Sequence, residues 1–247
     1  MGETRRTALI TGSGRNIGRA SALALAKNGI NVIVNGSSNQ ANCDAVADEV
    51  RALGVDALVY MADVGNPAEL EKMVSDGTKA FRRIDILVNN AAVRPNSPFL
   101  DTGEDEWERI LNIDFHAARR LARLCLPGML ENGWGRIINF AGMNAIHGYN
   151  GRAPVSVSKH ASWGLTKSLA KEFGKQGVTT NIISPGPIAP DEAEPEMREH
   201  IESMVGRVPV GRLGRNEEIG AMVALLASDD GAFINGQLLQ VNGGAET

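Results

Sequence analysis

The chain has 247 residues, of which 43% are hydrophobic, and a formal net charge of -4. This length can bury one sizeable core, so a single α/β domain is the expected organisation. The negative charge disfavours nucleic acid and anionic membranes as partners and leaves a small molecule as the favoured one. No apolar signal core follows the first six residues and no run reaches membrane-spanning length, which predicts a cytoplasmic protein.

The two cysteines, Cys43 and Cys125, lack the spacing of a metal site and are too few for a disulfide framework. We expect both to be buried free thiols in a reducing compartment, and we expect no metal.

The motif around which the chain is organised follows the first predicted strand, the apolar run 8–10. A turn containing Gly12, Gly14 and Gly18 comes next, and a helix of small residues is predicted over 19–28. Backbone N–H groups and the helix dipole gather at such a helix start and favour a pyrophosphate. Glycine-rich turns also occur without a ligand, but the strand before and the helix after favour nucleotide binding. The candidate contacts are Gly12, Ser13, Gly14, Arg15, Asn16, Ile17 and Gly18.

The second predicted strand, 30–35, ends without the acidic residue that usually binds an unphosphorylated adenosine ribose about twenty residues past the glycines. Asn35, Ser37 and Ser38 stand there instead. Arg15 offers a positive charge for a 2′-phosphate, although a solvated loop cation is the alternative. The sequence therefore favours NADP(H), with NAD(H) possible.

Two further strand ends carry candidate cofactor contacts. Asp63 and Val64 follow the strand 57–61, and Asp63 is a candidate acceptor for an adenine amino group. The central strand 84–88 ends in two amides and two small residues that let a nicotinamide approach and tie strand ends together: Asn89, Asn90, Ala91 and Ala92. Asn66 as N-cap, Pro67 at the first helical position and Glu69 as a reciprocal cap on the backbone of Asn66 predict a helix that runs to residue 81.

The remaining pattern predicts helices over 41–53, 105–130, 155–175 and 217–228, the last capped by Asn216, and strands over 137–140, 178–183 and 238–241. Pro127 should bend or end the long helix. Alternating strands and helices predict a Rossmann-type doubly wound parallel sheet of about seven strands with helices on both faces. The acidic, proline-broken stretch within 187–208 is a candidate mobile lid over the substrate.

Several of these motifs together resemble the short-chain dehydrogenase/reductase family across essentially the whole chain. They comprise the glycine loop, the segments 62–64 and 89–92, Asn112, Lys159, the segment 184–188 and the tail 236–244. Asn16 stands where the family usually has its middle glycine, and Asn tolerates the positive φ required. The resemblance implies an NAD(P)-dependent oxidoreductase that acts on a carbonyl or alcohol. It also implies cofactor contacts from Pro185, Gly186 and Ile188 and a homotetramer, or a homodimer, built on the 155–175 helix and the long helix before it.

The resemblance breaks at the proton donor. In the family a Tyr four residues before the Lys carries the proton, and a Ser thirteen residues before that Tyr holds the substrate oxygen. Those positions are Val155 and Gly142 here, so of the four catalytic positions only Asn112 and Lys159 match.

Other residues near this region are candidates for the missing chemistry. Tyr149 and His147 precede the Lys159 helix and could supply a proton, although lining the pocket is the alternative. Arg94 and Arg152 are candidates for a substrate carboxylate, with a surface role as the alternative for each. The expected substrate pocket also includes Gly142, Met143, Asn144 and Val155.

Three interpretations follow. The chain is an oxidoreductase with a non-standard proton donor, such as water, Tyr149 or His147. Alternatively, it uses the cofactor pocket for non-redox work, such as carbon–carbon cleavage or enolisation, or it is an inactive nucleotide-binding subunit.

Overall fold

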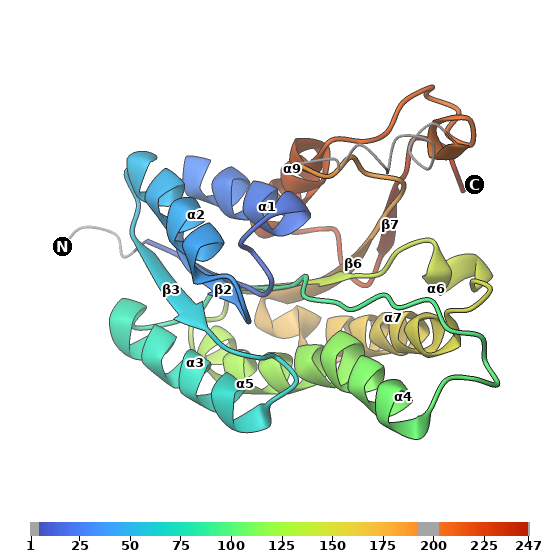
Figure 1. Ribbon diagram of the computed structural model, residues 1–247. Coiled ribbons are helices and arrows are strands. Elements are labelled where there is room, and N and C mark those ends of the chain that lie inside the picture. The colour runs from blue at the N-terminus through green and yellow to red at the C-terminus, as the bar shows by residue number, and fades with distance from the viewer. Residues whose placement is uncertain (1–4, 192–202, 247) are drawn as a thin grey trace.

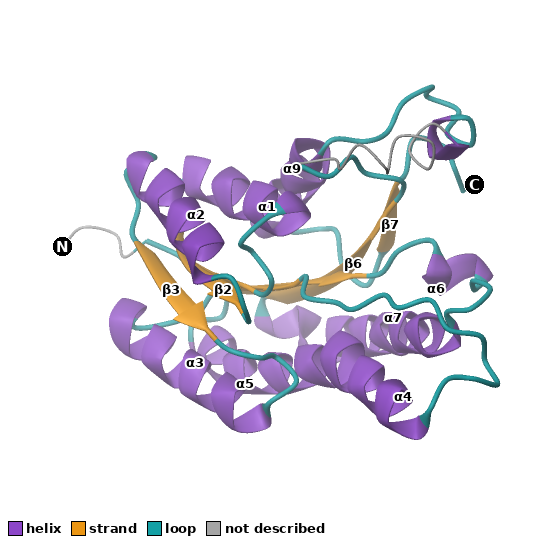
Figure 2. Cartoon of the chain, in the orientation of Figure 1, coloured by secondary structure: helices purple, strands orange, loops and turns teal. Residues whose placement is uncertain are grey.

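The computed structural model describes residues 5–191 and 203–246, and the predicted 187–208 lid lies partly outside this range. Seven parallel strands form one sheet in the order β3-β2-β1-β4-β5-β6-β7, with helices covering both faces (Figures 1 and 2). This confirms the predicted Rossmann-type doubly wound sheet. The strands are β1 (Thr7–Ile10), β2 (Asn31–Gly36), β3 (Ala57–Met61), β4 (Ile86–Asn89), β5 (Gly135–Phe140), β6 (Val178–Pro185) and β7 (Leu238–Val241).

Figure 1 shows α1, α2 and α9 on one face of the sheet and α3, α4, α5 and α7 on the other. Each face buries its own hydrophobic cluster, one against α1, α2 and α9 and one against α3 and α5. The helix bounds are α1 (Asn16–Lys27), α2 (Gln40–Ala52), α3 (Pro67–Phe81), α4 (Glu104–Leu111), α5 (Ala117–Glu131), α6 (Asn144–His147), α7 (Ala153–Phe173) and α9 (Asn216–Ala227).

The order in which strands are added to the sheet reverses at its centre. After β1, β2 and β3 the chain returns to place β4 against the other side of β1, in parallel register. In doubly wound sheets, ligands bind outside the carboxyl ends of the strands at such a switch point. The fold therefore brings the segments after β1 and β4 to one edge.

Three local predictions need correction. The predicted long helix is divided into α4, a π-helical turn (Asn112–His116) and α5, and α5 continues past Pro127 to Glu131. Asn216 is the first residue of α9, after an Arg215 cap, and its side chain bonds outside the helix. Glu69 accepts from the Asn66 side chain and the Asp63 N–H, and no bond to the backbone N–H of Asn66, the N-cap residue, is present.

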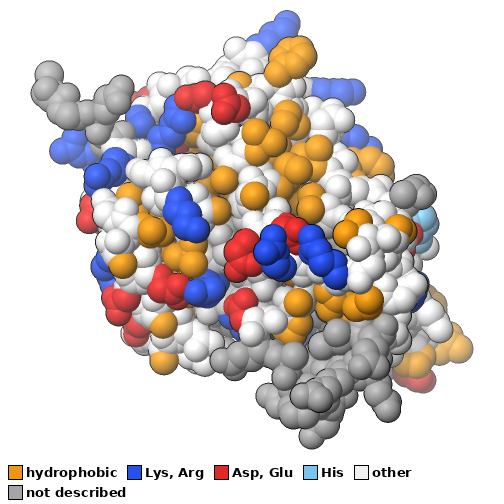
Figure 3. Space-filling view, turned by 90° about the horizontal axis from the view of Figure 1, so that it is seen from above, with side chains coloured by type: hydrophobic (Ala, Val, Ile, Leu, Met, Phe, Trp, Pro, Cys, Tyr) orange, Lys and Arg blue, Asp and Glu red, His pale blue; other side chains and the backbone are white. Residues whose placement is uncertain are grey.

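Both cysteines are buried and unpaired, and burial raises the pKa of the Cys125 thiol to about 12. Within the described ranges, no helix is long and apolar enough to cross a membrane. Charges of both signs are interspersed with hydrophobic side chains over α1, α2 and α9 (Figure 3).

Candidate functional site

A cleft of about 930 Å³ follows the carboxyl edge of the sheet. Ligand pockets typically have volumes of roughly 300–1,000 Å³, so this one suits an extended ligand. The loops after six strands contribute to its wall. The predicted cofactor residues that line it are Gly12, Gly14, Arg15, Asn16, Ile17, Gly18, Asn35, Ser37, Ser38, Asp63, Val64, Asn90, Ala91, Ala92, Lys159, Pro185, Gly186 and Ile188.

Unusual backbone geometry shapes the glycine loop. Gly12 has φ +61°, and a β-carbon there would lie 3.1 Å from the Cα of Ala91. Asn16 has φ +49°, which confirms the prediction that this residue replaces a glycine in the left-handed region. A β-carbon on Gly18 would lie 2.7 Å from the Cα of Ser13. The loop can therefore approach β4 and α1 more closely than side chains would permit.

Two predicted cofactor residues support this loop from beneath. Ser13 is fully buried and does not line the cleft; its hydroxyl donates to the Ile10 carbonyl at 2.9 Å. The Asn35 side chain accepts from the Gly12 N–H at 3.2 Å and donates to the carbonyls of Tyr60 and Ala62. Because these groups are already bonded, both residues hold the loop in position.

An anionic group already stands at the start of α1. The Asp191 carboxylate accepts from the Asn16 N–H at 2.7 Å, and the Asp191 N–H donates back to the Asn16 side chain. Asn216 also donates to this carboxylate at 2.9 Å. The start of α1 is therefore shaped to hold a negatively charged oxygen.

The amides at the end of β4 connect neighbouring strands, as predicted. Asn89 donates to the Asn139 side chain at 2.8 Å, and Asn90 donates to the carbonyls of Thr11 and Gly12. These bonds fix the floor of the cleft between β1 and β5.

A buried ion pair lies at the other end of the cleft. Lys159 on α7 contacts Asp114 of the π-helical turn, with Nζ and Oδ2 3.2 Å apart, and both side chains are nearly inaccessible to solvent. The second carboxylate oxygen accepts from the Val93 N–H at 2.8 Å. Burial lowers the pKa of Lys159, while Asp114 opposes this shift and the charge on Arg94 adds to it. The ammonium is thus held at the cleft wall by one carboxylate.

The other side chains at this end carry no hydroxyl. Val155 lies one helical turn before Lys159, and Gly142 follows β5; both line the cleft. Gly142 has φ +143°, which favours glycine, while a β-carbon there would meet nothing within 4 Å. Neither position therefore supplies an acid to the part of the cleft wall that Lys159 lines.

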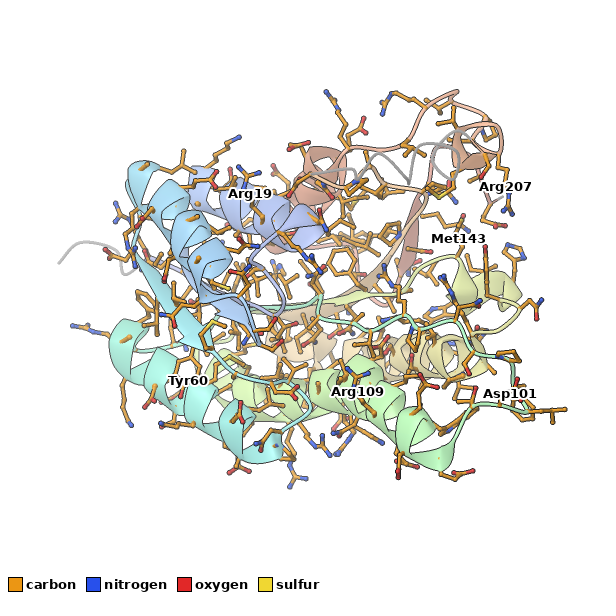
Figure 4. All side chains as sticks on the ribbon, viewed as in Figure 1. Arg19, Tyr60, Asp101, Arg109, Met143 and Arg207 are labelled. Atoms are coloured by element: carbon orange, nitrogen blue, oxygen red, sulfur yellow. The ribbon has the colours of Figure 1, made fainter. Side chains whose placement is uncertain are left out.

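The structure brings only some of the other predicted residues into the cleft. Arg94, Met143 and Arg152 line it, and Figure 4 marks Met143 just before α6. Asn144 begins α6, but its side chain lies outside the described part. Asn112 does not line the cleft; its amide donates to the Gly65 carbonyl at 2.6 Å and accepts from Arg120.

Comparisons with known proteins identify the family of this chain. A family model described as enoyl-(acyl carrier protein) reductase matches residues 12–246. The 3-oxoacyl-[acyl-carrier-protein] reductase FabG of Staphylococcus aureus (strain Mu50) is 35% identical over 239 residues, which is 97% of each chain. The chain belongs to the short-chain dehydrogenase/reductase family. The corresponding FabG reductase of Escherichia coli (strain K12) is 34% identical over 97% of this chain and 96% of its own.

A solved structure agrees with this placement. The crystal structure of a candidate NAD(P)-dependent gluconate 5-dehydrogenase from Beutenbergia cavernae, with bound NADP at low occupancy, superposes with a TM-score of 0.89. It is 33% identical and covers 97% of this chain and 96% of its own. This short-chain dehydrogenase/reductase chain thus aligns along nearly its whole length with a nucleotide-binding relative.

Neither predicted stand-in acid lines the cleft of this family member. Nε2 of His147 lies 2.7 Å from a Glu246 carboxylate oxygen, and its side chain is half exposed. Tyr149 is 46% exposed and its ring packs beside the Arg152 guanidinium. The expectation that either side chain reaches the reacting end is therefore not supported by this geometry.

Two residues of the site, Asp114 and Arg109, were not predicted from the sequence. Asp114 sits two residues after Asn112, where an unbroken α-helix was expected and a π-helical turn occurs. Arg109 lines the cleft from α4 (Figure 4). No motif marks either position, since their placement depends on how α4 and α5 pack. In the described ranges, no group of three His, Cys, Asp or Glu side chains could hold a metal.

Proposed function

We propose that the protein is an NADP(H)-dependent oxidoreductase that interconverts a carbonyl and an alcohol on a small molecule, with a proton donor other than tyrosine. The observation that carries this proposal is the single cleft that joins the glycine loop, the small residues after β4 and Lys159. Relatives described as reductases, and a similar structure with bound NADP, support the same activity.

The cofactor pocket fits a dinucleotide phosphate. The Asp191 carboxylate accepts from the Asn16 N–H at the start of α1, which supports this proposal because a pyrophosphate oxygen would accept from the same end of the helix. At the adenosine end, Arg15, Ser37 and Ser38 line the cleft, and residues 36–39 include no acid to repel a 2′-phosphate. Lys159 would bond the nicotinamide ribose, a role that its place in the cleft wall supports. When bound, the cofactor supplies or accepts a hydride.

The family's proton-donating Tyr and oxygen-binding Ser correspond to Val155 and Gly142 in this chain. As hydride reaches a carbonyl carbon, the oxygen gains negative charge and needs a proton and a hydrogen-bond donor. Loss of a positioned acid typically costs roughly 10²–10⁴ in rate, and loss of one oxyanion donor costs roughly 10²–10³. The proposed enzyme therefore turns over slowly, or it obtains both functions elsewhere.

Among the residues that the structure describes, Lys159 is the cationic group best placed to stabilise negative charge on the reacting oxygen. Its ammonium lies at the cleft wall in the space beside Val155, and burial lowers its pKa, which makes proton release easier. We propose that Lys159 stabilises the developing alkoxide and that a solvent water, or Lys159 itself, delivers the proton. Asp114 keeps the ammonium charged and in position.

Titration with NADPH and with NADH, followed by a panel of ketones and β-dicarbonyls, tests the proposal. Both nicotinamide oxidation and product mass are followed. We expect tighter binding of NADPH and oxidation that is stoichiometric with alcohol formation. Product without nicotinamide oxidation would indicate non-redox chemistry, and binding without any product would indicate an inactive nucleotide-binding subunit.

A further inference from the structure

Besides Arg15 at the adenosine end, three arginines line the cleft: Arg94 after β4, Arg109 on α4 and Arg152 before α7. Within residues 5–191 and 203–246, none of the three guanidiniums has a carboxylate or hydrogen-bonding partner. Arginine has five donors in a planar fork that matches carboxylate oxygens, and clustered guanidiniums repel one another. Such a cluster is expected where a ligand supplies the missing acceptors.

The lack of a hydrogen-bond acceptor is clearest for the Arg152 side chain. Its Nε atom is shielded from solvent and has no hydrogen-bond partner in the part of the chain that the structure describes. Buried donors in folded proteins are nearly always bonded. The guanidinium carbon lies 5.1 Å from the centre of the Tyr149 ring, which restricts the plane of the fork. Arg152 is therefore oriented and lacks an acceptor.

The charges around Arg94 also favour an anionic ligand. The Arg94 side chain is exposed, and the charges of Asp114 and Arg152 lie near it. Asp114 is the nearby acid, but its two oxygens face Lys159 and the Val93 N–H. Asp63 is the only acidic residue in the described cleft lining, and it follows β3 at the adenosine end. Among the residues that the structure describes, no acid is therefore paired with Arg94 or Arg152 at the reacting end.

We propose that Arg94 and Arg152 bind a carboxylate of the substrate, so that the substrate is an oxo acid or its hydroxy acid counterpart with the reacting oxygen toward Lys159. The inference rests on the proposed oxidoreductase function. Arg109, at the exposed rim of the cleft, attracts the substrate carboxylate by its charge but does not contact it directly.

The test compares short oxo acids with their neutral methyl esters, for example levulinate and methyl levulinate. Calorimetry in the presence of NADP⁺ measures binding to the wild type, to Arg94→Met and to Arg152→Met. We expect the wild type to bind the acid at least tenfold more tightly than the ester. Each substitution should reduce acid affinity by about 10- to 100-fold, because charge-assisted bonds are lost, and leave ester affinity unchanged.

Arg51→Met, on α2 outside the cleft lining, is the matched control and should retain the preference for the acid. Arg94→Lys should retain part of it, because the charge remains and the fork does not. Thermal unfolding and NADPH affinity, measured for every variant, confirm that the cleft is intact.

Equal binding of acid and ester, or an unchanged preference in both arginine variants, would overturn the inference. Weaker NADPH binding by Arg94→Met with the acid preference intact would also overturn it and would assign that arginine to the cofactor. Binding is measured without turnover, so the two proposals fail separately. Acid preference without nicotinamide oxidation contradicts only the oxidoreductase function, and oxidation with equal use of esters contradicts only the carboxylate site.

Discussion

The chemistry of this chain depends on two positions that lack a side-chain hydroxyl. Val155 and Gly142 line the reacting end of the cleft, and neither can donate a proton. Gly142 also adopts φ +143°, so restoring a serine there would strain the backbone even though space exists for its side chain. The tyrosine position is the simpler one to restore, because Val155 lies in a regular helix turn before Lys159.

The first prediction is that Val155→Tyr raises carbonyl reduction by NADPH by about 10²-fold or more. The new phenol would stand one turn before Lys159, whose charge favours proton release, and would supply the missing acid. Steady-state rates on the ketone panel measure the effect. Val155→Phe is the control, since it adds the ring without the hydroxyl. Equal rates in the two variants would show that a missing acid is not what limits turnover.

The second prediction concerns Asp191, whose carboxylate bonds to the Asn16 N–H where a pyrophosphate would bind. Asp191→Ala removes this competing charge and should tighten NADPH binding by about 2- to 5-fold, the equivalent of the 0.3–1 kcal/mol typical for an anion at a helix start. Fluorescence titration measures the affinity. Asp101→Ala, on an exposed loop marked in Figure 4, should leave the affinity unchanged. Weaker binding by Asp191→Ala would mean that the carboxylate supports the site and does not compete for it.

At the scale of elements, the π-helical turn (Asn112–His116) is the feature that positions Asp114 against Lys159. π-helical turns often occur at functional sites, where they redirect a side chain. Here the turn places a carboxylate beneath an ammonium that burial would otherwise discharge. The Asp114–Lys159 ion pair therefore connects the π-helical turn to the proposed chemistry of the cleft.

The third prediction is that Asp114→Asn lowers the free energy of unfolding by about 3 kcal/mol, because it leaves the buried ammonium without its counter-ion. Denaturant unfolding at neutral pH measures the change. Asp48→Asn, which breaks an exposed pair with Arg51, should have a much smaller effect. Comparable losses in the two variants would contradict a structural role for the buried pair.

The free energy of unfolding of Asp114→Asn should also depend on pH differently from that of the wild type. The folded-state pKa of Lys159 is lowered, so the unfolded chain binds more protons between that value and the ordinary lysine pKa of about 10.4. Stability from this group therefore rises with pH across that window. Without Asp114, which raises the Lys159 pKa, the window should begin at lower pH.

Most elements follow from sequence periodicity, but their junctions do not. β3 and β7 occur at the predicted residues, because apolar runs bounded by turn residues define them. The Asp114–Lys159 pair depends on the packing of α4, α5 and α7, which periodicity does not encode. Arg152 lines the cleft whereas Tyr149 and His147 do not, although all three lie within residues 147–152. The glycine loop was predictable because its function requires an unusual local backbone.

At the scale of the whole molecule, the oligomeric state and the cytoplasmic location remain predictions. Val157 on α7 is 46% exposed, as expected if that helix packs against a second copy. The fourth prediction is a particle of four chains, or of two, by native mass spectrometry. Val157→Glu should shift it to smaller species, whereas Leu53→Glu after α2 should not. A monomeric wild type would contradict the assembly implied by the family.

The central claim is that NADP(H) lies along the carboxyl edge of the sheet and exchanges a hydride with a substrate beside Lys159. The most direct measurement uses NADPH that carries deuterium at the transferable position of the nicotinamide, with mass spectrometry of the product. The account predicts one deuterium on the carbinol carbon for each NADPH oxidised. A product that forms without deuterium while NADPH remains reduced would contradict it.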